Sequence, residues 1–310
     1  MGRRTERVVR TGFATVVGRP NVGKSTLVNT MVGTKVSITS ARPNTTRHKV
    51  RGVIHRPDAQ VVLVDTPGLH RPKTALGERL NQTVAASLED MDAVIALVDA
   101  TAAVGPGDRT VLGRSLDALR RADGSGGLMV AVNKVDRAKS DQVLERLVSV
   151  AETVERLLAE RHWGEAYEPA VEYFPVSAVT GAGVDALVDA VVTFLPEGPA
   201  YYPDDMVTDT PEAERVAELV REQLLVRARE ELPHSIACRV TEWEWPRIRV
   251  EILVERDSQK AIVIGTGGEV LKAVGSAVRT ELPPGAYLEL FVRVEKHWQQ
   301  RNDALDRLGY

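Results

Sequence analysis

The feature that most restricts the fold of this chain is the glycine-rich segment Gly18–Ser25, with the sequence GRPNVGKS. It matches the pattern G-x-x-x-x-G-K-[ST], and it lies between a strand-like run, Phe13–Val17, and a helix-like segment, Lys24–Met31. Glycine lets backbone N–H groups converge on phosphate oxygens, and the positive end of the following helix strengthens that attraction. We therefore predict a nucleoside-triphosphate site in which Lys24 reaches the β- and γ-phosphates and Ser25 binds Mg²⁺.

Strand-like and helix-like segments alternate along the first part of the chain. The strand-like apolar runs are Phe13–Val17, Val50–Ile54, Val61–Val64, Ala93–Val98, Leu128–Val132 and Val171–Val176. Helical spacing of apolar residues covers Arg109–Arg121 and Ser140–Glu160. This alternation predicts an α/β domain with a mostly parallel sheet and helices on both faces.

Two segments after the glycine-rich loop are candidates for sensing the third phosphate. In the motif DTPG, at Asp65–Gly68, the acid can hold Mg²⁺ through water and the Gly68 N–H can bond the γ-phosphate. The polar segment Ala41–Arg47 offers a hydroxyl for the Mg²⁺ shell, from Thr46 or, as the alternative, from Thr45. The predicted catalytic residues are Lys24, Thr46 and Gly68, and the predicted metal ligands are Ser25, Thr46 and Asp65.

A third motif, NKVD at Asn133–Asp136, is suited to selecting the base. The Asp136 carboxylate can accept two hydrogen bonds from guanine, whereas adenine would leave this anion without partners. Asn133 is expected to brace the loops and the Lys134 stem to pack on the base, while the backbone at Ser177-Ala178 meets guanine O6. The predicted nucleotide-binding residues are Gly18, Arg19, Pro20, Asn21, Val22, Gly23, Lys24, Ser25, Thr26, Asp65, Thr66, Pro67, Gly68, Asn133, Lys134, Asp136, Ser177 and Ala178.

Other function classes share parts of this pattern. A P-loop kinase or an ATPase would also carry the Gly18–Ser25 loop, but NKVD and the lack of a recognisable phosphoacceptor site argue against a kinase. Leu69 stands where Ras-like enzymes have a glutamine that orients the attacking water. An RNA-binding module, in which guanine nucleotide is a structural or regulatory ligand with little turnover, is therefore the alternative to a GTP-hydrolysing enzyme.

A second domain follows a segment rich in proline, glycine and aspartate. We predict a basic tail at residues 1–10, a nucleotide-binding domain at 11–198, a linker at 199–211 and a smaller α+β domain at 212–310. The second domain has a helix to about Glu231, strands at Ile236–Glu242 and Arg247–Glu255, a glycine-rich turn, a helix at Glu269–Glu281, a strand at Tyr287–Glu295 and a short terminal helix.

Together these motifs resemble the Era family of GTPases, within the translation-factor-related class, over nearly the whole chain. The residues that carry the resemblance are GRPNVGKST at Gly18–Thr26, NTTRH at Asn44–His48, DTPGLH at Asp65–His70, NKVD at Asn133–Asp136, SA at Ser177-Ala178, LPHS at Leu232–Ser235, IGxxG at Ile264–Gly268 and LxxLGY at Leu305–Tyr310. The resemblance implies a P-loop GTPase domain followed by a type II KH domain. It also implies a GTP-hydrolysing switch that binds the 3′ region of 16S rRNA and assists assembly of the 30S ribosomal subunit.

The resemblance further implies ligands and an RNA clamp. GTP or GDP and Mg²⁺ are the implied ligands, and Asn21 resembles an asparagine linked to K⁺ in related GTPases, with a loop-bracing hydrogen bond as the alternative role. The glycine-rich turn resembles the GXXG loop of KH domains, which clamps a few nucleotides by close approach of the two backbones. The implied RNA-binding residues are Gly265, Thr266, Gly267, Gly268 and Lys272.

The charge distribution and the single cysteine restrict the binding partners and the cellular compartment expected for this protein. The formal net charge is −3, and residues 201–310 hold 15 basic and 20 acidic side chains, so RNA binding must rest on a local site. With one cysteine, Cys238, no internal disulfide can form, and no apolar run reaches the roughly 20 residues of a membrane span. The protein is expected to be a cytoplasmic monomer with at most peripheral contact with the inner face of the cell membrane.

Overall fold

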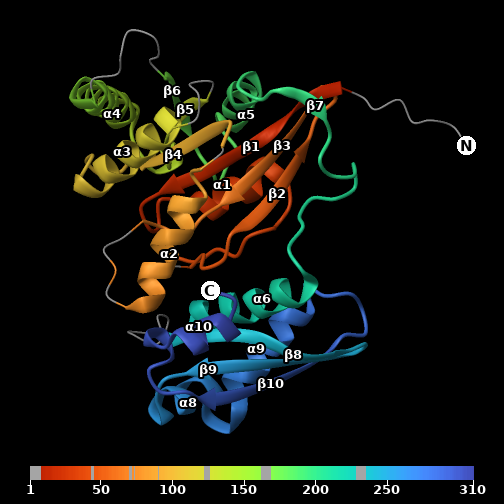
Figure 1. Ribbon diagram of the computed structural model, residues 1–310. Helices are drawn as coiled ribbons and strands as arrows, with labels where there is room; N and C mark the ends of the chain where they lie inside the picture. Colours follow the sequence, from red (N-terminus) through yellow and green to blue (C-terminus); the bar gives the residue numbers. More distant parts are fainter. Residues whose placement is uncertain are drawn as a thin grey trace, which may run out of the picture. The chain divides into compact units, whose positions relative to one another are not determined.

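The computed structural model describes residues 8–42, 45–69, 72, 74–89, 91–121, 126–161, 169–227 and 235–310. The chain divides into two compact units (Figure 1). The first comprises Met1–Ser37, Thr46–Arg71 and Leu80–Asp209, and the second comprises Ile38–Thr45, Pro72–Arg79 and Thr210–Tyr310. Two short segments from the sequence of the nucleotide-binding domain therefore belong to the second unit.

A mostly parallel sheet forms the centre of the first unit. Its strands are β1 (Val8–Gly18), β2 (Val50–His55), β3 (Ala59–Asp65), β4 (Ala93–Asp99), β5 (Gly127–Asn133), β6 (Ala170–Val176) and β7 (Glu197–Pro199). The order is β2-β3-β1-β4-β5-β6, with β7 also paired to β1. Strand β2 is antiparallel to β3 and β7 is antiparallel to β1, while the pairs in between are parallel. The predicted sheet is thus confirmed.

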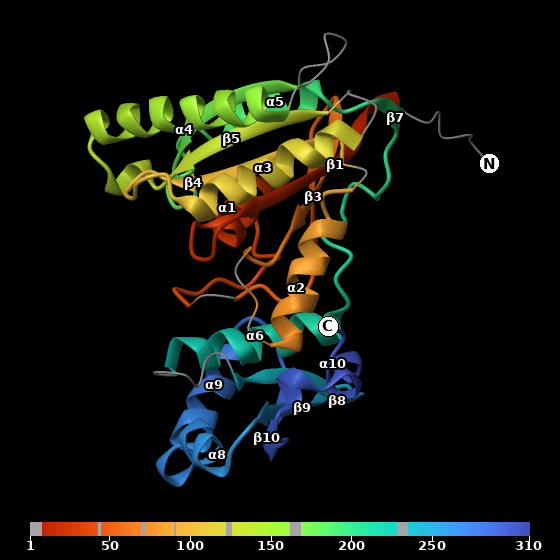
Figure 2. The same ribbon diagram turned by 60° about the vertical axis from the view of Figure 1, so that its left-hand side comes forward.

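Helices cover both faces of this sheet. They are α1 (Lys24–Val32), α3 (Pro106–Arg121), α4 (Ser140–Arg161) and α5 (Val184–Thr193), with a short 3-10 helix η1 (Val135–Arg137). A further helix, α2 (Ala75–Ala86), begins in the second unit and belongs to the first from Leu80 onward. In β4, Ile95 packs into a core shared with α1 and α5, whereas Val94 packs into a second core with α3 and α4. Figure 2 shows the helices and strands of this unit from a second direction. Because alternate residues of a strand point to opposite faces, the continuous apolar run of β4 is buried on both sides.

Several features of the first unit differ from the sequence-based prediction. Helices α2 and α5 have no counterpart in that prediction. Strand β1 begins at Val8, within the segment predicted as a basic tail, and Val8 and Arg10 pair with β7. The guanidinium of Arg10 donates to the carbonyls of Thr193 and Leu195, so this arginine ties the strand to the end of α5 instead of lying in a solvated tail.

Part of the predicted linker is also held by the first unit. The N–H of Val53 in β2 donates to the Val207 carbonyl at 2.9 Å. The side chain of Gln60 in β3 donates to the Tyr202 carbonyl at 2.8 Å. These hydrogen bonds satisfy backbone groups that a free linker would leave to water, and they extend the first unit to Asp209.

The second unit is a small α+β domain. Its elements are α6 (Glu212–Arg227), β8 (Ala237–Glu244), β9 (Arg247–Val254), α8 (Asp257–Ile264), η2 (Thr266–Gly268), α9 (Glu269–Arg279), β10 (Tyr287–Val294), η3 (Trp298–Gln300) and α10 (Asn302–Arg307). The sheet order is β10-β9-β8, with β9 parallel to β10 and antiparallel to β8. Helices α6, α8 and α9 pack on one face through apolar residues such as Val220, Val263 and Val274. The predicted end of α6 near Glu231 lies outside the described residues.

The stretch Asp257–Arg279 is long and apolar enough to qualify as a candidate membrane span by length and composition alone. The structure divides it into α8 and α9, because Gly265 and Gly267 adopt backbone angles that no helix continues through. The stretch is therefore two short helices with a glycine loop between them.

Candidate functional site

The glycine-rich loop folds around the side chain of Lys24. Gly23 is the N-cap residue of α1 and has φ 104°, and a Cβ at that position would lie 2.4 Å from the Asn133 side-chain nitrogen, so only glycine fits. The Lys24 ammonium is buried and donates to the carbonyls of Gly18 and Arg19, at 3.2 and 3.1 Å. Burial lowers the pKa of Lys24 to about 8, although the charge of Asp65 opposes this. A buried cation bonded to neutral oxygens beside a helix N-terminus fits a phosphate group.

Hydroxyls and a carboxylate gather next to this loop. The Ser25 and Thr46 side-chain oxygens lie 2.8 Å apart, and Thr46 Oγ1 lies 3.4 Å from Asp65 Oδ2. Asp65 is fully buried, and its Oδ1 has no hydrogen-bond partner among the described residues. Burial raises the pKa of Asp65, and a hydrogen bond from Ser37 is the largest opposing influence. Oxygen ligands of this kind suit Mg²⁺, and the orphaned Oδ1 fits a metal-bound water.

The structure separates the two candidate threonines. Thr46 Oγ1 lies with Ser25 and Asp65, whereas Thr45 Oγ1 donates to the Arg42 carbonyl at 2.7 Å. Thr46 is thus the threonine with a side chain at the candidate metal cluster. Among the described residues, no group of three or more His, Cys, Asp or Glu side chains could hold a metal ion.

The DTPG segment lies against the glycine-rich loop. A Cβ on Gly68 would lie 3.0 Å from the backbone of Pro20, so glycine allows the close approach. The Thr66 hydroxyl donates to the Val16 carbonyl at 2.7 Å and braces β1 against the end of β3, and Pro67 beside it is buried. Leu69 is also buried and belongs to the apolar core with Val17.

The base-selecting motif ties three loops together. Asn133 donates to the Val22 carbonyl at 2.8 Å and accepts from the Ala178 N–H at 2.9 Å. Asp136 Oδ1 accepts from the Ser177 hydroxyl at 2.6 Å, which aligns this carboxylate with the last loop. The interactions match the bracing role predicted for Asn133.

Lys134 also links these loops, in part through Asp99, which belongs to none of the sequence motifs. It adopts φ 72°, and its ammonium donates to the Asn21 carbonyl at 2.9 Å and to Asp99 Oδ2 at 2.6 Å. Burial acts to raise the pKa of Asp99, but hydrogen bonds from Lys134 and Thr101 hold it below its usual value. Asp99 is the last residue of β4. An acidic residue directly after an apolar run is visible in the sequence, and it could have marked Asp99 as a candidate site residue.

The predicted nucleotide residues therefore meet at one edge of the sheet. Strands β1, β3, β4, β5 and β6 end at Gly18, Asp65, Asp99, Asn133 and Val176. The carboxyl ends of parallel strands are where open α/β sheets bind ligands. The arrangement can hold a phosphate chain at Lys24, a cation at the hydroxyl cluster and a base near Asp136.

The glycine loop of the second unit connects α8 to α9. A Cβ on Gly265, which has φ 75°, would lie 2.5 Å from the Val270 side chain, so this position requires glycine. Gly267 and Gly268 also have positive φ, but a Cβ there would meet no atom within 4 Å. Thr266 and Gly267 are exposed, as is Lys272 in the first part of α9. The backbone of a ligand can therefore approach this loop closely, and Lys272 supplies a positive charge beside it.

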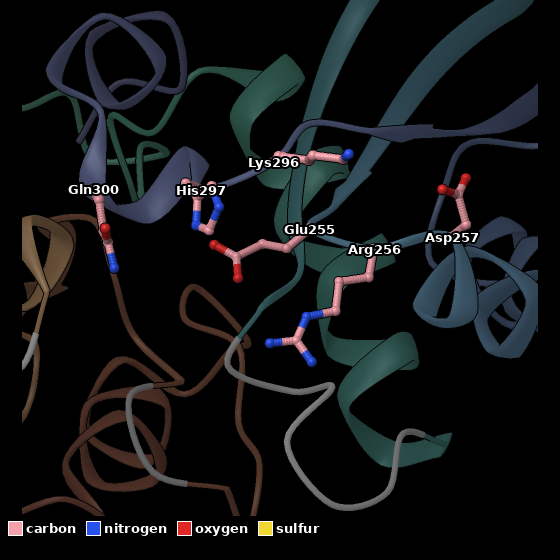
Figure 3. A pocket seen from close by; sticks show the side chains of 6 residues that line it. All are labelled: Glu255, Arg256, Asp257, Lys296, His297 and Gln300. Carbon is pink, nitrogen blue, oxygen red and sulfur yellow. The ribbon is translucent and has the colours of Figure 1, made fainter.

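A separate cavity of about 450 Å³ lies in the second unit, where β9 and β10 end (Figure 3). It is lined by Glu255, Arg256, Asp257, Lys296, His297 and Gln300. Its charges are mixed, and the Glu255 carboxylate points toward His297 in Figure 3. None of the predicted RNA-binding residues lines this cavity.

Comparison with protein families identifies two known domains. The family described as 50S ribosome-binding GTPase matches residues 13–134, and the KH domain matches residues 231–299. GTPase Era of Mycobacterium avium is 46% identical over 313 residues, which cover 97% of this chain and 99% of that protein. GTPase Era of Mycobacterium tuberculosis is 45% identical over 312 residues, with 96% and 98% covered.

Solved structures match over the same extent. A crystal structure of Era in complex with MgGDPNP and nucleotides 1506–1542 of 16S ribosomal RNA has a TM-score of 0.82, at 35% identity over 97% of this chain and 99% of that one. A variant of Aquifex aeolicus Era bound to GDP·AlF4⁻ has a TM-score of 0.80, with the same identity and coverage. The predicted order of a P-loop GTPase domain and a KH domain is thus confirmed.

Proposed function

This chain belongs to the Era family of GTPases, and from that premise we propose that it is a GTP-hydrolysing switch that binds the 3′ region of 16S rRNA and assists assembly of the 30S subunit. One observation carries the proposal. Lys24, the Ser25–Thr46–Asp65 cluster and Asp136 come from loops at one edge of one sheet, in a chain that also carries a KH domain.

In the proposed mechanism, the protein holds the triphosphate while water attacks the γ-phosphorus. The Lys24 ammonium and the unpaired N–H groups at the start of α1 hold the β- and γ-phosphates. Ser25, Thr46 and Asp65 would hold Mg²⁺, which when bound would offset the negative charge of the phosphate oxygens. The Gly68 N–H bonds the γ-phosphate, so that loss of this phosphate releases the DTPG segment and changes the state of the switch.

The attacking water needs a partner other than Leu69. That side chain is apolar and packs in the core, so it can neither donate nor accept a hydrogen bond. We extend the proposal to a K⁺ ion near Asn21, whose charge would favour the transition state. Asn21 lies in the phosphate loop and is exposed, so its amide oxygen could serve as a ligand for such an ion.

Recognition of 16S rRNA is proposed for the KH domain. The support is twofold: a full-length structural relative is bound to nucleotides 1506–1542 of 16S ribosomal RNA, and the loop Gly265–Gly268 is open at Gly267 and Gly268. Close approach of the RNA backbone to this loop would leave the bases to an adjoining apolar surface. Exposed Ile262, on the helix before the loop, supplies such a surface.

The test combines turnover with RNA binding in the full-length protein. Phosphate release from GTP is measured in K⁺ and in Na⁺ buffer, with an RNA of the 16S 3′ end, with the same nucleotides in scrambled order, and without RNA. We expect turnover in K⁺, slower turnover in Na⁺, and tighter binding of the 3′-end RNA with a non-hydrolysable GTP analogue than with GDP. Equal affinity for the scrambled RNA would contradict the rRNA assignment, and no turnover in any condition would favour the nucleotide-regulated binding module.

A further inference from the structure

Ser37 lies at the candidate metal site, although none of the sequence motifs includes it. It is 2% exposed and lies between the end of α1 and the segment Ile38–Thr45, which belongs to the second unit. Its hydroxyl donates to Asp65 Oδ2 at 2.7 Å, which is shorter than the 3.4 Å from Thr46 Oγ1 to the same oxygen. Ser37 therefore makes the closer of these two side-chain contacts with the Asp65 carboxylate.

The backbone of Ser37 is itself held by a side chain of α1. Asn29 Oδ1 accepts from the N–H groups of Val36 and Ser37, both at 2.9 Å, and Asn29 Nδ2 donates to the Ser37 carbonyl at 2.8 Å. Two of these hydrogen bonds join Ser37, and the third joins its neighbour Val36, to the helix that begins at the phosphate loop. The Ser37 hydroxyl is thus held at a defined position relative to Lys24 and Ser25, which begin the same helix.

The result is a carboxylate whose two oxygens have different surroundings. Ser37 and Thr46 both lie on the Oδ2 side, while Oδ1 is buried and has no partner among the described residues. A hydrogen bond to one oxygen of a carboxylate restricts its rotation and fixes the direction of the other. Outer hydrogen bonds of this kind orient metal ligands and tune metal affinity.

We propose that Ser37, held by Asn29, is a positioning residue for Mg²⁺ at the nucleotide site, because its hydroxyl fixes the Asp65 carboxylate and leaves Oδ1 for the hydration shell of the metal. The proposal rests on the proposed function, since it takes the nucleotide-bound Mg²⁺ as its ligand. It assigns Ser37 no contact with the nucleotide, so the residue acts on the metal through Asp65.

Ser37 and Thr46 flank the segment Ile38–Thr45. The segment Ile38–Thr45 leaves the first unit after Ser37 and returns to it at Thr46. Both flanking hydroxyls contact the same oxygen of Asp65. Loss of the Ser37 hydroxyl would remove one of the two anchors, and we expect the effect to be seen first in the Mg²⁺ dependence of nucleotide release.

The experiment follows release of a fluorescent N-methylanthraniloyl GDP from the full-length protein over a series of Mg²⁺ concentrations. The variants are Ser37→Ala, Ser37→Thr and Ser40→Ala. Ser40 is a matched control, because its hydroxyl accepts from the Arg42 N–H in the same segment. For Ser37→Ala we expect the Mg²⁺ concentration that half-maximally slows release to rise about 10- to 100-fold. Ser37→Thr retains a hydroxyl and should restore most of the wild-type dependence, and Ser40→Ala should match the wild type.

A second measurement separates metal positioning from folding. Thermal unfolding is recorded without ligand, with GDP alone and with GDP plus Mg²⁺, and the proposal predicts that Ser37→Ala loses mainly the additional stabilisation by Mg²⁺. A Mg²⁺ dependence of release within about 2-fold of wild type in Ser37→Ala would overturn the proposal. Equal losses with GDP alone and with GDP plus Mg²⁺ would also overturn it, as would failure of Ser37→Thr to recover. If the wild type itself released GDP independently of Mg²⁺, the proposed nucleotide site would fail together with this inference.

Discussion

The side-chain oxygens of Ser25 and Thr46 lie 2.8 Å apart, although 21 residues separate them in the chain. Thr45, the neighbour of Thr46, instead bonds the Arg42 carbonyl. Two adjacent threonines with the same chemistry therefore have different surroundings. This difference provides a matched pair for testing the metal site.

Replacement of each threonine by valine should have unequal effects on turnover. Thr46→Val removes a hydroxyl from the Ser25–Asp65 cluster, and we expect the rate of GTP hydrolysis at fixed, limiting Mg²⁺ to fall by at least about 10-fold. Thr45→Val removes a bond to a backbone carbonyl and should stay within about 3-fold of the wild type. Phosphate release under single-turnover conditions measures both, and the reverse order of effects would contradict the placement of Thr46 at the metal.

Asp136→Asn should change the base that is preferred. The carboxylate accepts from guanine donors, whereas an amide can donate to the second carbonyl of xanthine. We expect GDP affinity to fall by at least about 10-fold and xanthosine diphosphate affinity to rise. Calorimetry with both nucleotides measures the shift. Asp141→Asn, at an exposed acid in the first turn of α4, is the control and should bind GDP like the wild type. An unchanged preference in Asp136→Asn would be inconsistent with base selection by this residue.

Lys24→Met should stabilise the nucleotide-free protein at pH 7. Burial lowers the pKa of Lys24 from 10.5 to about 8, so between these values the unfolded chain binds the proton more often than the folded protein. The cost of the buried charge is thus fully present below pH 8 and disappears as the pH rises toward 10.5. We expect an advantage for Lys24→Met on the order of 1–3 kcal/mol at pH 7.

Urea unfolding without nucleotide, at a series of pH values, measures this advantage. The advantage of Lys24→Met should decrease as the pH rises from about 8, the pKa of Lys24 in the folded protein, to 10.5, its ordinary value. Lys272→Met removes an exposed lysine from α9 and should show no comparable trend. The predicted cost of burying the Lys24 charge would be contradicted if the wild type were more stable than Lys24→Met at pH 7. It would also be contradicted if the difference in free energy of unfolding between the two proteins did not decrease as the pH rises.

An acidic side chain in the glycine loop of the KH domain should weaken RNA binding. Gly267 and Gly285 are both exposed, both have positive φ, and neither would place a Cβ within 4 Å of another atom. Gly267→Glu adds a negative charge where the RNA backbone is proposed to approach, and we expect at least about 10-fold weaker binding. Gly285→Glu carries the same charge and similar backbone strain in another loop. Equal losses in the two variants, measured by fluorescence anisotropy, would indicate a general charge effect instead of a site at Gly267.

Parts of the fold could be predicted because their patterns have few alternatives. Continuous apolar runs such as Ala93–Val98 predict buried parallel strands, and β4 has this form. Helix α5 was missed because Val184–Thr193 is rich in valine, which fits a strand as well as a helix. Helix α2 was missed although Leu76, Leu80 and Val84, all buried, recur at a helical spacing of four residues.

The candidate site could also be predicted only in part. The common edge of Gly18, Asp65 and Asn133 follows from the rule that parallel strands end together, once each motif is assigned to a strand end. The choice between Thr45 and Thr46 could not be made from the sequence, because it depends on how an irregular segment is folded. Ser37 carried no signal either, since a serine beside apolar residues is common and its contact with Asp65 requires tertiary structure.

Phosphate release by the purified protein supplied with Mg²⁺ and either GTP or ATP tests the proposed function at its foundation. We expect repeated turnover of GTP and release from ATP no greater than in a protein-free blank. Equal release from both nucleotides would contradict base selection by Asp136. No release from GTP would show that the Lys24 loop and the Ser25–Thr46–Asp65 cluster do not form a hydrolytic site.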